Sequence, residues 1–267
     1  MDQQPQKQPA ESPAEIYEHY MVPATFAPWV SALLDCAAPQ PGERVLDVAC
    51  GTGVVARHAV AQVGAGGRVV GLDMNPHMLA IARARAPAVE WREGNAMALP
   101  FAAHAFDVVV CQQGLQFFPE SSTALWEMHR VLVPGGRLAL AVWCAIDSSP
   151  GHHALAQGLE RHVSTEAAAL MYAVFRLSDA RTLQTLLEAA GFRAVGVRRE
   201  RRVARFPTPE AFTRWVVVGS VLGRTGVQVH DEALTTVIRE VNGALEPYVH
   251  ADGLAFPMEA HLAVART

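Results

Sequence analysis

The chain of 267 residues contains little lysine and no excess of positive charge, and these shortages exclude several classes of protein. Lysine occurs once, at Lys7, so nearly all of the 22 basic residues are arginines. The formal net charge of −4 offers no basic surface for nucleic acid or for an anionic membrane. The expected ligand is therefore a small molecule.

The chain also has few cysteines, and none of them forms a CxxC pair. The four are Cys36, Cys50, Cys111 and Cys144. Each lies in or beside an apolar run, so we interpret them as reduced thiols rather than as disulfide partners or zinc ligands. No set of carboxylates and histidines has the spacing of metal ligands either, and we expect no metal.

No run of 18 or more apolar residues occurs, so no segment is expected to span a membrane. The first 13 residues are rich in Gln and Pro and lack the apolar stretch of a signal peptide. We therefore expect a disordered tail at 1–13 and a cytoplasmic protein. With 51% hydrophobic and 18% charged residues, the chain has ample material for a core.

Short apolar segments alternate with helical patterns through the first half of the chain. The expected strands are 44–49, 68–72, 89–92, 106–111, 137–143, 195–205 and 255–264. The expected helices are 54–63, 76–85, 121–132 and 180–191. Because parallel neighbours need crossover connections, this alternation predicts an α/β fold with a mostly parallel, doubly wound sheet of seven strands.

Two helical stretches have no place in such a sheet, and they divide the chain into segments. We expect a helical segment at 14–42, interrupted at Pro23, followed by a ligand-binding core at 43–145. A core helix and strand follow at 178–207, and a final strand at 253–267. The stretches 146–177 and 208–252 are predicted to form a helical lid.

A glycine-rich turn follows the first expected strand and gives the strongest local signal. Its sequence is Cys50-Gly51-Thr52-Gly53, and the glycines let the backbone turn tightly and approach a ligand. The helix that begins beyond the turn presents free N–H groups. Asp73 ends the second strand, where a carboxylate accepts both hydroxyls of a ribose. The combination predicts a nucleotide-like ligand.

A nicotinamide dinucleotide is one such ligand, because the segment 51–56 satisfies the G-x-G-x-x-A pattern. Asp47 counts against it, since the first strand of a dinucleotide fold is usually apolar. The single lysine also excludes the Tyr-x-x-x-Lys pair of short-chain dehydrogenases. An NAD(P)-binding oxidoreductase is therefore the weaker alternative, beside a noncatalytic adenosyl-binding protein on the same fold.

Five motifs in order resemble those of class I S-adenosylmethionine-dependent methyltransferases, in the branch of ubiquinone/menaquinone-biosynthesis and natural-product enzymes. They are DVACGTG at 47–53, VVGLDM at 69–74, EGNAMALPF at 93–101, FDVVVC at 106–111 and the PGG turn at 134–136. The resemblance implies a Rossmann-like sheet whose last strand is antiparallel, with S-adenosylmethionine as cofactor. It also implies in-line methyl transfer to an O, N or C nucleophile of a quinone, phenolic or natural-product-like acceptor.

The resemblance assigns cofactor contacts to particular residues. The backbone at Ala49, Gly51 and Gly53 is expected at the methionine portion. Asp47 is expected either to fix this loop or to reach the amino group through water. Asp73 is expected at the ribose.

Further contacts are expected at both ends of the cofactor. Met74, Asn95 and Ala96 are assigned to the adenine. Asn95 stands where Asp is usual, but its amide oxygen still accepts hydrogen bonds. Cys111 and Gln112 are expected beside the transferred methyl group, with Gln116 facing the same site.

Three other features remain as hypotheses. Tyr20, with its neighbour Tyr17, is a candidate to cover the sulfonium, whose charge favours an aromatic face. Packing of an amphipathic helix on the core is the alternative. His153, in the pair His152-His153, is a candidate general base. The arginine run at 198–202 is interpreted as a solvated strand edge protected against aggregation.

We predict no metal requirement, because the motifs supply an organic methyl donor and no carboxylate or histidine group has metal-ligand spacing. Methyl transfer measured after dialysis against EDTA should equal that of untreated protein. Loss of activity that magnesium restores would contradict the prediction.

Overall fold

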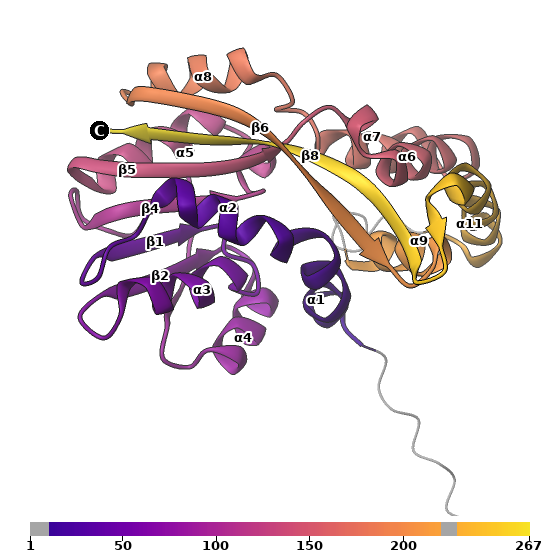
Figure 1. Cartoon of the computed structure of the whole chain (residues 1–267), viewed down its shortest axis with the longest axis horizontal. Coiled ribbons are helices and arrows are strands. Elements are labelled where there is room, and N and C mark those ends of the chain that lie inside the picture. Colours follow the sequence, from indigo (N-terminus) through magenta and orange to yellow (C-terminus); the bar gives the residue numbers. More distant parts are fainter. Residues whose placement is uncertain (1–10, 220–228) are drawn as a thin grey trace, which may run out of the picture.

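The structure, a computed structural model, describes residues 11–219 and 229–267. Its sheet has the strand order β3-β2-β1-β4-β5-β8-β6 (Figure 1). The first five strands are parallel, and β8 runs antiparallel between β5 and β6. The predicted doubly wound sheet with an antiparallel last strand is therefore confirmed. A short strand, β7, pairs with β8 in addition.

The strands follow the predicted segments closely. They are β1 (Arg44–Val48), β2 (Arg68–Asp73), β3 (Glu90–Glu93), β4 (Phe106–Gln112), β5 (Leu132–Trp143), β6 (Arg193–Phe206), β7 (Val249–His250) and β8 (Gly253–Arg266). The main difference is at β5, which begins before the expected turn. Its pairing with β4 jumps from Leu132 to Arg137, so the Pro-Gly-Gly turn is a bulge within the strand.

Helices cover both faces of the sheet (Figure 1). They are α1 (Pro13–Ile16), the π-helix η1 (Tyr17–Phe26), α2 (Ala27–Ala37), α3 (Val54–Val63), α4 (Pro76–Arg85), α5 (Ser121–Val131), α6 (Pro150–His162), α7 (Thr165–Ala173), α8 (Ala180–Ala189), α9 (Pro209–Gly219) and α11 (Asp231–Leu245). The short 3₁₀ turns are η2 (Leu115–Phe117), η3 (Ile146–Ser148) and η4 (Glu246–Tyr248). Apolar residues of α2, α3 and α4 pack on one face, and those of α5 and α8 pack on the other.

The helices of the two expected lid stretches form one lobe beside the sheet (Figure 1). Apolar residues of α6, α7, α9 and α11 share a core with the far ends of β6 and β8. β8 is paired with β5 only as far as Ala260, and from there to Leu254 it continues in pairing with β6. The lobe is thus built on the sheet itself rather than on loops. Part of the second stretch, residues 220–228, lies outside the described residues.

The N-terminal segment is helical from Pro13 to Ala37, without the expected interruption at Pro23. Pro23 lies inside the π-helix, whose wider turns carry the helix past a residue that has no N–H to donate. Ser12 caps the start of the helix by accepting a hydrogen bond from the Glu15 N–H. Residues 11–13 therefore belong to the helix start rather than to a disordered tail, and 1–10 lie outside the described residues.

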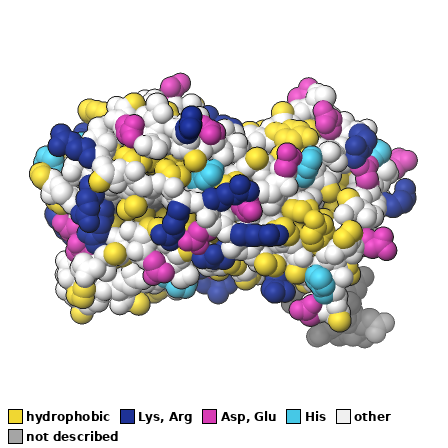
Figure 2. Space-filling view, turned by 45° about the horizontal axis from the view of Figure 1, so that its top comes forward, with side chains coloured by type: hydrophobic (Ala, Val, Ile, Leu, Met, Phe, Trp, Pro, Cys, Tyr) yellow, Lys and Arg dark blue, Asp and Glu magenta, His cyan; other side chains and the backbone are white. Residues whose placement is uncertain are grey.

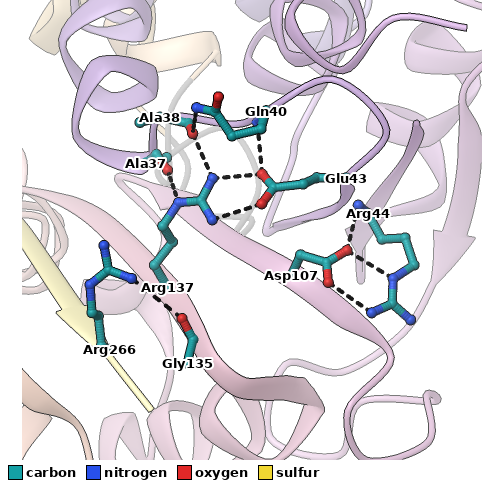
Figure 3. A network of polar contacts seen from close by, with 9 residues as sticks. All are labelled: Ala37, Ala38, Gln40, Glu43, Arg44, Asp107, Gly135, Arg137 and Arg266. Carbon is teal, nitrogen blue, oxygen red and sulfur yellow. Dashed lines mark hydrogen bonds and ion pairs between the residues drawn. The ribbon is translucent and has the colours of Figure 1, made fainter. Parts of the chain in front are cut away.

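A network of charged side chains fastens the edge of the sheet where the parallel strands begin (Figure 3). Arg137 of β5 donates to the Ala37 carbonyl at the end of α2 (2.5 Å) and to both carboxylate oxygens of Glu43 (2.9 and 2.6 Å). Arg44 of β1 holds Asp107 of β4 through two guanidinium contacts of 2.9 and 2.8 Å. These contacts lie at the start of the strands, so the opposite edge, where the parallel strands end, is open to a ligand site.

The arginine run lies on β6, the edge strand of the sheet. Arg198 and Arg202 both pair with Glu200, and Arg199 pairs with Glu259 on β8. Figure 2 shows arginines lying beside carboxylates on this side of the molecule. The paired charges agree with a solvated, protected edge.

We predict that Gly53→Ala destabilises the protein more than Gly64→Ala does. Both glycines have a positive φ (+85° and +65°), so both substitutions strain the backbone. At Gly53 a Cβ would lie 2.2 Å from the Trp91 ring, which donates a hydrogen bond to the Ala86 carbonyl; nothing lies within 4 Å at Gly64. Overpacking against Trp91 should add about 1–3 kcal/mol to the loss of folding free energy in Gly53→Ala. Denaturant unfolding measures both variants, and equal losses would contradict the prediction.

Candidate active site

A cavity of about 700 Å³ lies at the edge where the parallel strands end, between the sheet and the helical lobe. This size is ordinary for a small-molecule site, and open α/β sheets bind ligands at this edge. It includes the following residues predicted to contact the cofactor: Ala49, Gly51, Asp73, Met74, Asn95, Ala96 and Gln112. The structure therefore brings together residues that are up to 63 positions apart in the chain.

The glycine-rich turn is held to the end of β2 by Asp73. Its Oδ2 accepts a hydrogen bond from the Gly51 N–H (2.8 Å), and its Oδ1 accepts one from the Asn75 N–H (2.8 Å). Ala49 and Gly51 both have a φ near +55°, which turns the backbone sharply at the cavity wall. Each Asp73 oxygen has a second lone pair, so the carboxylate can still accept hydroxyl groups of a ligand.

Asp47 lies behind the cavity wall rather than in it. The side chain is buried, and its Oδ2 accepts a hydrogen bond from the Ala56 N–H (3.0 Å) in the first turn of α3. Burial, together with the negative charge of Asp73, raises the pKa of Asp47 to about 8. Of the two roles predicted for it, fixing the loop is the one that this geometry supports.

The residues assigned to adenine all line the cavity, but at different depths. Met74 is 74% exposed there, and Ala96 lies deeper, with 6% exposed. The Asn95 side-chain oxygen, expected to meet the adenine amino group, accepts a hydrogen bond from the Met97 N–H (2.9 Å). Asn95 therefore also shapes its own turn.

Besides Asp47, the predicted residues Gly53, Cys111 and Gln116 also lie outside the cavity lining. The space in front of Gly53 is occupied by Trp91. Cys111 alternates with Gln112 along β4 and is fully buried on the other face, where burial raises the pKa of its thiol to about 12. Gln116 is buried and donates to the side-chain oxygen of Gln113 (3.4 Å), so it supports the cavity wall from behind.

Tyr17, rather than Tyr20, lies on the cavity. The Tyr17 hydroxyl is 3.7 Å from the point where a Cβ on Gly51 would lie. Tyr20 stacks on Trp215 of α9, with ring centroids 4.2 Å apart, and joins the N-terminal helix to the lobe. The expectation that Tyr20 covers a sulfonium is therefore corrected: packing decides its orientation.

His152, rather than His153, faces the cavity. His152 is buried, with Nδ1 2.8 Å from the Ser149 hydroxyl, and burial lowers its pKa to about 4. His153 points outward, with Nδ1 3.4 Å from Asp147. Neighbouring residues on a helix point about 100° apart, so only one of the pair can face inward. The candidate base His153 is corrected accordingly.

The lobe side of the cavity is largely apolar. Its wall is formed by Met21, Phe26, Trp143, Met171, Val174 and Val216. A few polar groups interrupt it, among them Gln112, which donates to the Phe26 carbonyl (3.1 Å), Gln113 and Thr25. No cofactor contact was assigned to Gln113 or Thr25 from the sequence, although Gln113 is adjacent to the predicted Gln112.

Charge is scarce around this cavity. Among the lining residues in the described part of the chain, Asp73 is the only one that carries a formal charge at neutral pH. Over residues 11–219 and 229–267, no group of three or more His, Cys, Asp or Glu side chains is placed to hold a metal ion. None of the described helices is both long and apolar enough to cross a membrane.

Comparisons with known proteins point to methyltransferases. The chain is 43% identical over 115 residues to a 2-phytyl-1,4-naphthoquinone methyltransferase of Thermosynechococcus vestitus, covering 42% of this chain and 51% of the relative. It is 36% identical over 173 residues to a demethylmenaquinone methyltransferase of Lactococcus lactis, covering 58% of this chain and 67% of the relative.

The fold and the family model agree with these relatives. A phosphoethanolamine N-methyltransferase of Haemonchus contortus, solved with S-adenosylmethionine, has a TM-score of 0.56 at 18% identity, over 89% of this chain and 52% of that one. Residues 21–201 match the model of the ubiE/COQ5 methyltransferase family. This range includes the five motifs and the first part of the lobe. The chain therefore belongs to the ubiE/COQ5 methyltransferase family.

Proposed function

We propose that the protein transfers the methyl group of S-adenosylmethionine to an uncharged, quinol-type aromatic acceptor. The observation that carries this proposal is the division of one cavity into two unlike parts. The strand-end part offers backbone groups and the Asp73 carboxylate, and the lobe part offers an apolar wall without formal charge.

The strand-end part fits an adenosyl cofactor. Gly51 lines the cavity beside Tyr17, and its lack of a side chain leaves the backbone of the turn accessible to a ligand. Asp73 retains lone pairs for the two ribose hydroxyls, and Met74 offers an exposed apolar side chain for the adenine. Ala49 and Ala96 would complete the wall through their backbone groups.

The lobe part fits a neutral ring compound. In the described residues, neither lysine nor arginine lines this cavity, so nothing there would balance a carboxylate or a phosphate on the acceptor. Phe26 and Trp143, with ring centroids 6.2 Å apart, form part of the wall on which a ring can pack. The two relatives are named for 2-phytyl-1,4-naphthoquinone and for demethylmenaquinone, and both are uncharged quinones.

The catalytic contribution of the chain is mainly to align the reactants and exclude water. When bound, S-adenosylmethionine supplies a methyl group activated by its sulfonium. Asp73 and the turn at Ala49 and Gly51 would hold the donor in one orientation, while the apolar wall would hold the acceptor ring opposite the methyl group. Such alignment can supply much of the rate enhancement of an in-line displacement.

We predict that the protein methylates 2-phytyl-1,4-naphthoquinone that has been reduced with dithionite. Mass spectrometry should detect a product 14 Da heavier, in amounts equal to the S-adenosylhomocysteine formed. A naphthoquinol that carries a carboxylate should react more slowly, because no cation lines the lobe part. Turnover of neither acceptor, or preference for the carboxylate, would contradict the proposed acceptor class.

We predict that Asp73→Ala weakens S-adenosylmethionine binding by about 2–3 kcal/mol, because two ribose hydroxyls lose a charged acceptor. Calorimetric titration measures the change. Asp73→Asn is the matched control for the loop, because its amide oxygen can still accept from one of the two backbone N–H groups. Its loss of binding free energy should therefore be smaller than that of Asp73→Ala. An unchanged dissociation constant in a folded Asp73→Ala variant would remove Asp73 from the binding site.

A further inference from the structure

His152 is the one histidine among the described residues that lines the cavity, and it lies on the lobe side of it. It projects from the first turn of α6. Its Nδ1 contacts the Ser149 hydroxyl at 2.8 Å, and no partner for its Nε2 is found among the described residues. One ring nitrogen is thus held by the protein, and the other is available to a ligand.

Packing leaves this imidazole little freedom to rotate. Phe175, Phe212 and Phe256 surround it in edge-to-face geometry, with ring centroids 5.6, 5.3 and 6.1 Å away. They come from the segment after α7, from α9 and from β8. Ser149, which precedes α6, is itself buried. A polar side chain fixed in an apolar shell at a cavity wall is costly to bury, so a role in binding or catalysis is a reasonable expectation.

The surroundings keep this imidazole uncharged at neutral pH. Burial alone lowers its pKa, and no charged group contributes. The adjacent titratable side chain points elsewhere, since His153 lies near Asp147. Further along α6, Arg161 and His162 both pair with Glu240 of α11. The rings that pack against the imidazole from neighbouring elements are those of Phe175, Phe212 and Phe256, which do not titrate. A neutral imidazole has one nitrogen that can accept a proton.

We propose that His152 accepts the hydroxyl proton of the methyl acceptor at Nε2, and that Ser149 fixes the imidazole in the required orientation. The inference rests on the proposed methyl transfer and adds to it the residue that activates the nucleophile. In the required tautomer, Nδ1–H donates to the Ser149 oxygen, which leaves the Nε2 lone pair directed at the cavity.

With a quinol acceptor, the proposed methyl transfer removes two protons from the acceptor and returns one. The O–H bond breaks and its proton moves to Nε2, while the electron pair forms a carbonyl and the adjacent ring carbon attacks the methyl carbon. The ring carbon displaces S-adenosylhomocysteine, which keeps the bonding pair on its sulfur. The hydrogen on the methylated carbon then leaves to water, and the carbonyl takes the proton back from Nε2. The products are a methylated quinol, S-adenosylhomocysteine and one proton.

The first test compares matched glutamine variants of the two adjacent histidines. His152→Gln should lower kcat by about 100-fold or more, the usual contribution of a general base. His153→Gln should leave kcat within about twofold, because His153 faces away from the cavity. Ser149→Ala should lower kcat by a smaller factor than His152→Gln. Dissociation constants for S-adenosylmethionine, measured by calorimetry, should stay unchanged in all three variants.

The dependence of rate on pH separates a base from a packing residue. With His152 neutral, kcat should stay level from pH 8 down to about pH 5 and fall only as pH approaches the pKa of about 4. In His152→Gln the acceptor must ionise by itself, so the rate should rise roughly tenfold per pH unit below the phenol pKa of about 10. Parallel pH profiles in the two proteins would overturn the proposal.

A binding experiment gives a readout that does not require turnover. The protein is labelled with ¹⁵N-histidine, and the Nε2 signal of His152 is identified as the one that disappears in the His152→Gln variant. Addition of 1,4-dihydroxynaphthalene to the protein with S-adenosylhomocysteine should shift this signal, while 1,4-dimethoxynaphthalene, which has no hydroxyl to donate, should not. Equal shifts with both compounds, or no shift with either, would overturn the contact.

The outcomes also separate this inference from the proposed function. If the wild-type protein methylates the quinol and His152→Gln does so equally well, the function stands and the role of His152 fails. If the wild-type protein binds S-adenosylmethionine but methylates no quinol, the proposed function fails. The nitrogen signal then still decides whether His152 contacts an aromatic hydroxyl.

Discussion

The difference in length between the central strands and the last two strands determines where this protein can bind a ligand. β6 and β8 continue beyond the point where β5 ends, and their far ends form part of the core of the helical lobe. Because they belong to the same sheet, the lobe is held over the edge where the parallel strands end. The cavity is the space that remains between that edge and the lobe.

Backbone conformations at the cavity are costly, and the surrounding structure maintains them. Ala49 and Gln113 line the cavity with φ values of +56° and +54°, although neither is glycine. Such conformations cost roughly 1–3 kcal/mol each and occur mainly at functional sites. The Asp73 carboxylate accepts from the Gly51 N–H, and the buried Asp47 accepts from the Ala56 N–H, so two acidic side chains hold the segment that follows Ala49.

Candidate site residues that lie close together in the sequence point to different places once their helices are packed. Tyr17 reaches the cavity while Tyr20 stacks on Trp215, and His152 faces inward while His153 faces Asp147. In each pair the residue types were recognisable from the sequence. The rotation of the helix about its axis, which only packing sets, decides which of the two enters the site.

The sequence by itself determined the sheet, the glycine-rich turn and the positions of Asp73 and Asn95, because these depend on neighbours close along the chain and on the strand alternation. It also indicated a methyltransferase through motifs that stay in order from β1 to β5. Only the tertiary structure decided the lobe side of the site. Phe26 packs near Trp143 there, and Phe212 and Phe256 enclose His152. These contacts join elements that are distant in sequence, and such packing leaves no local pattern.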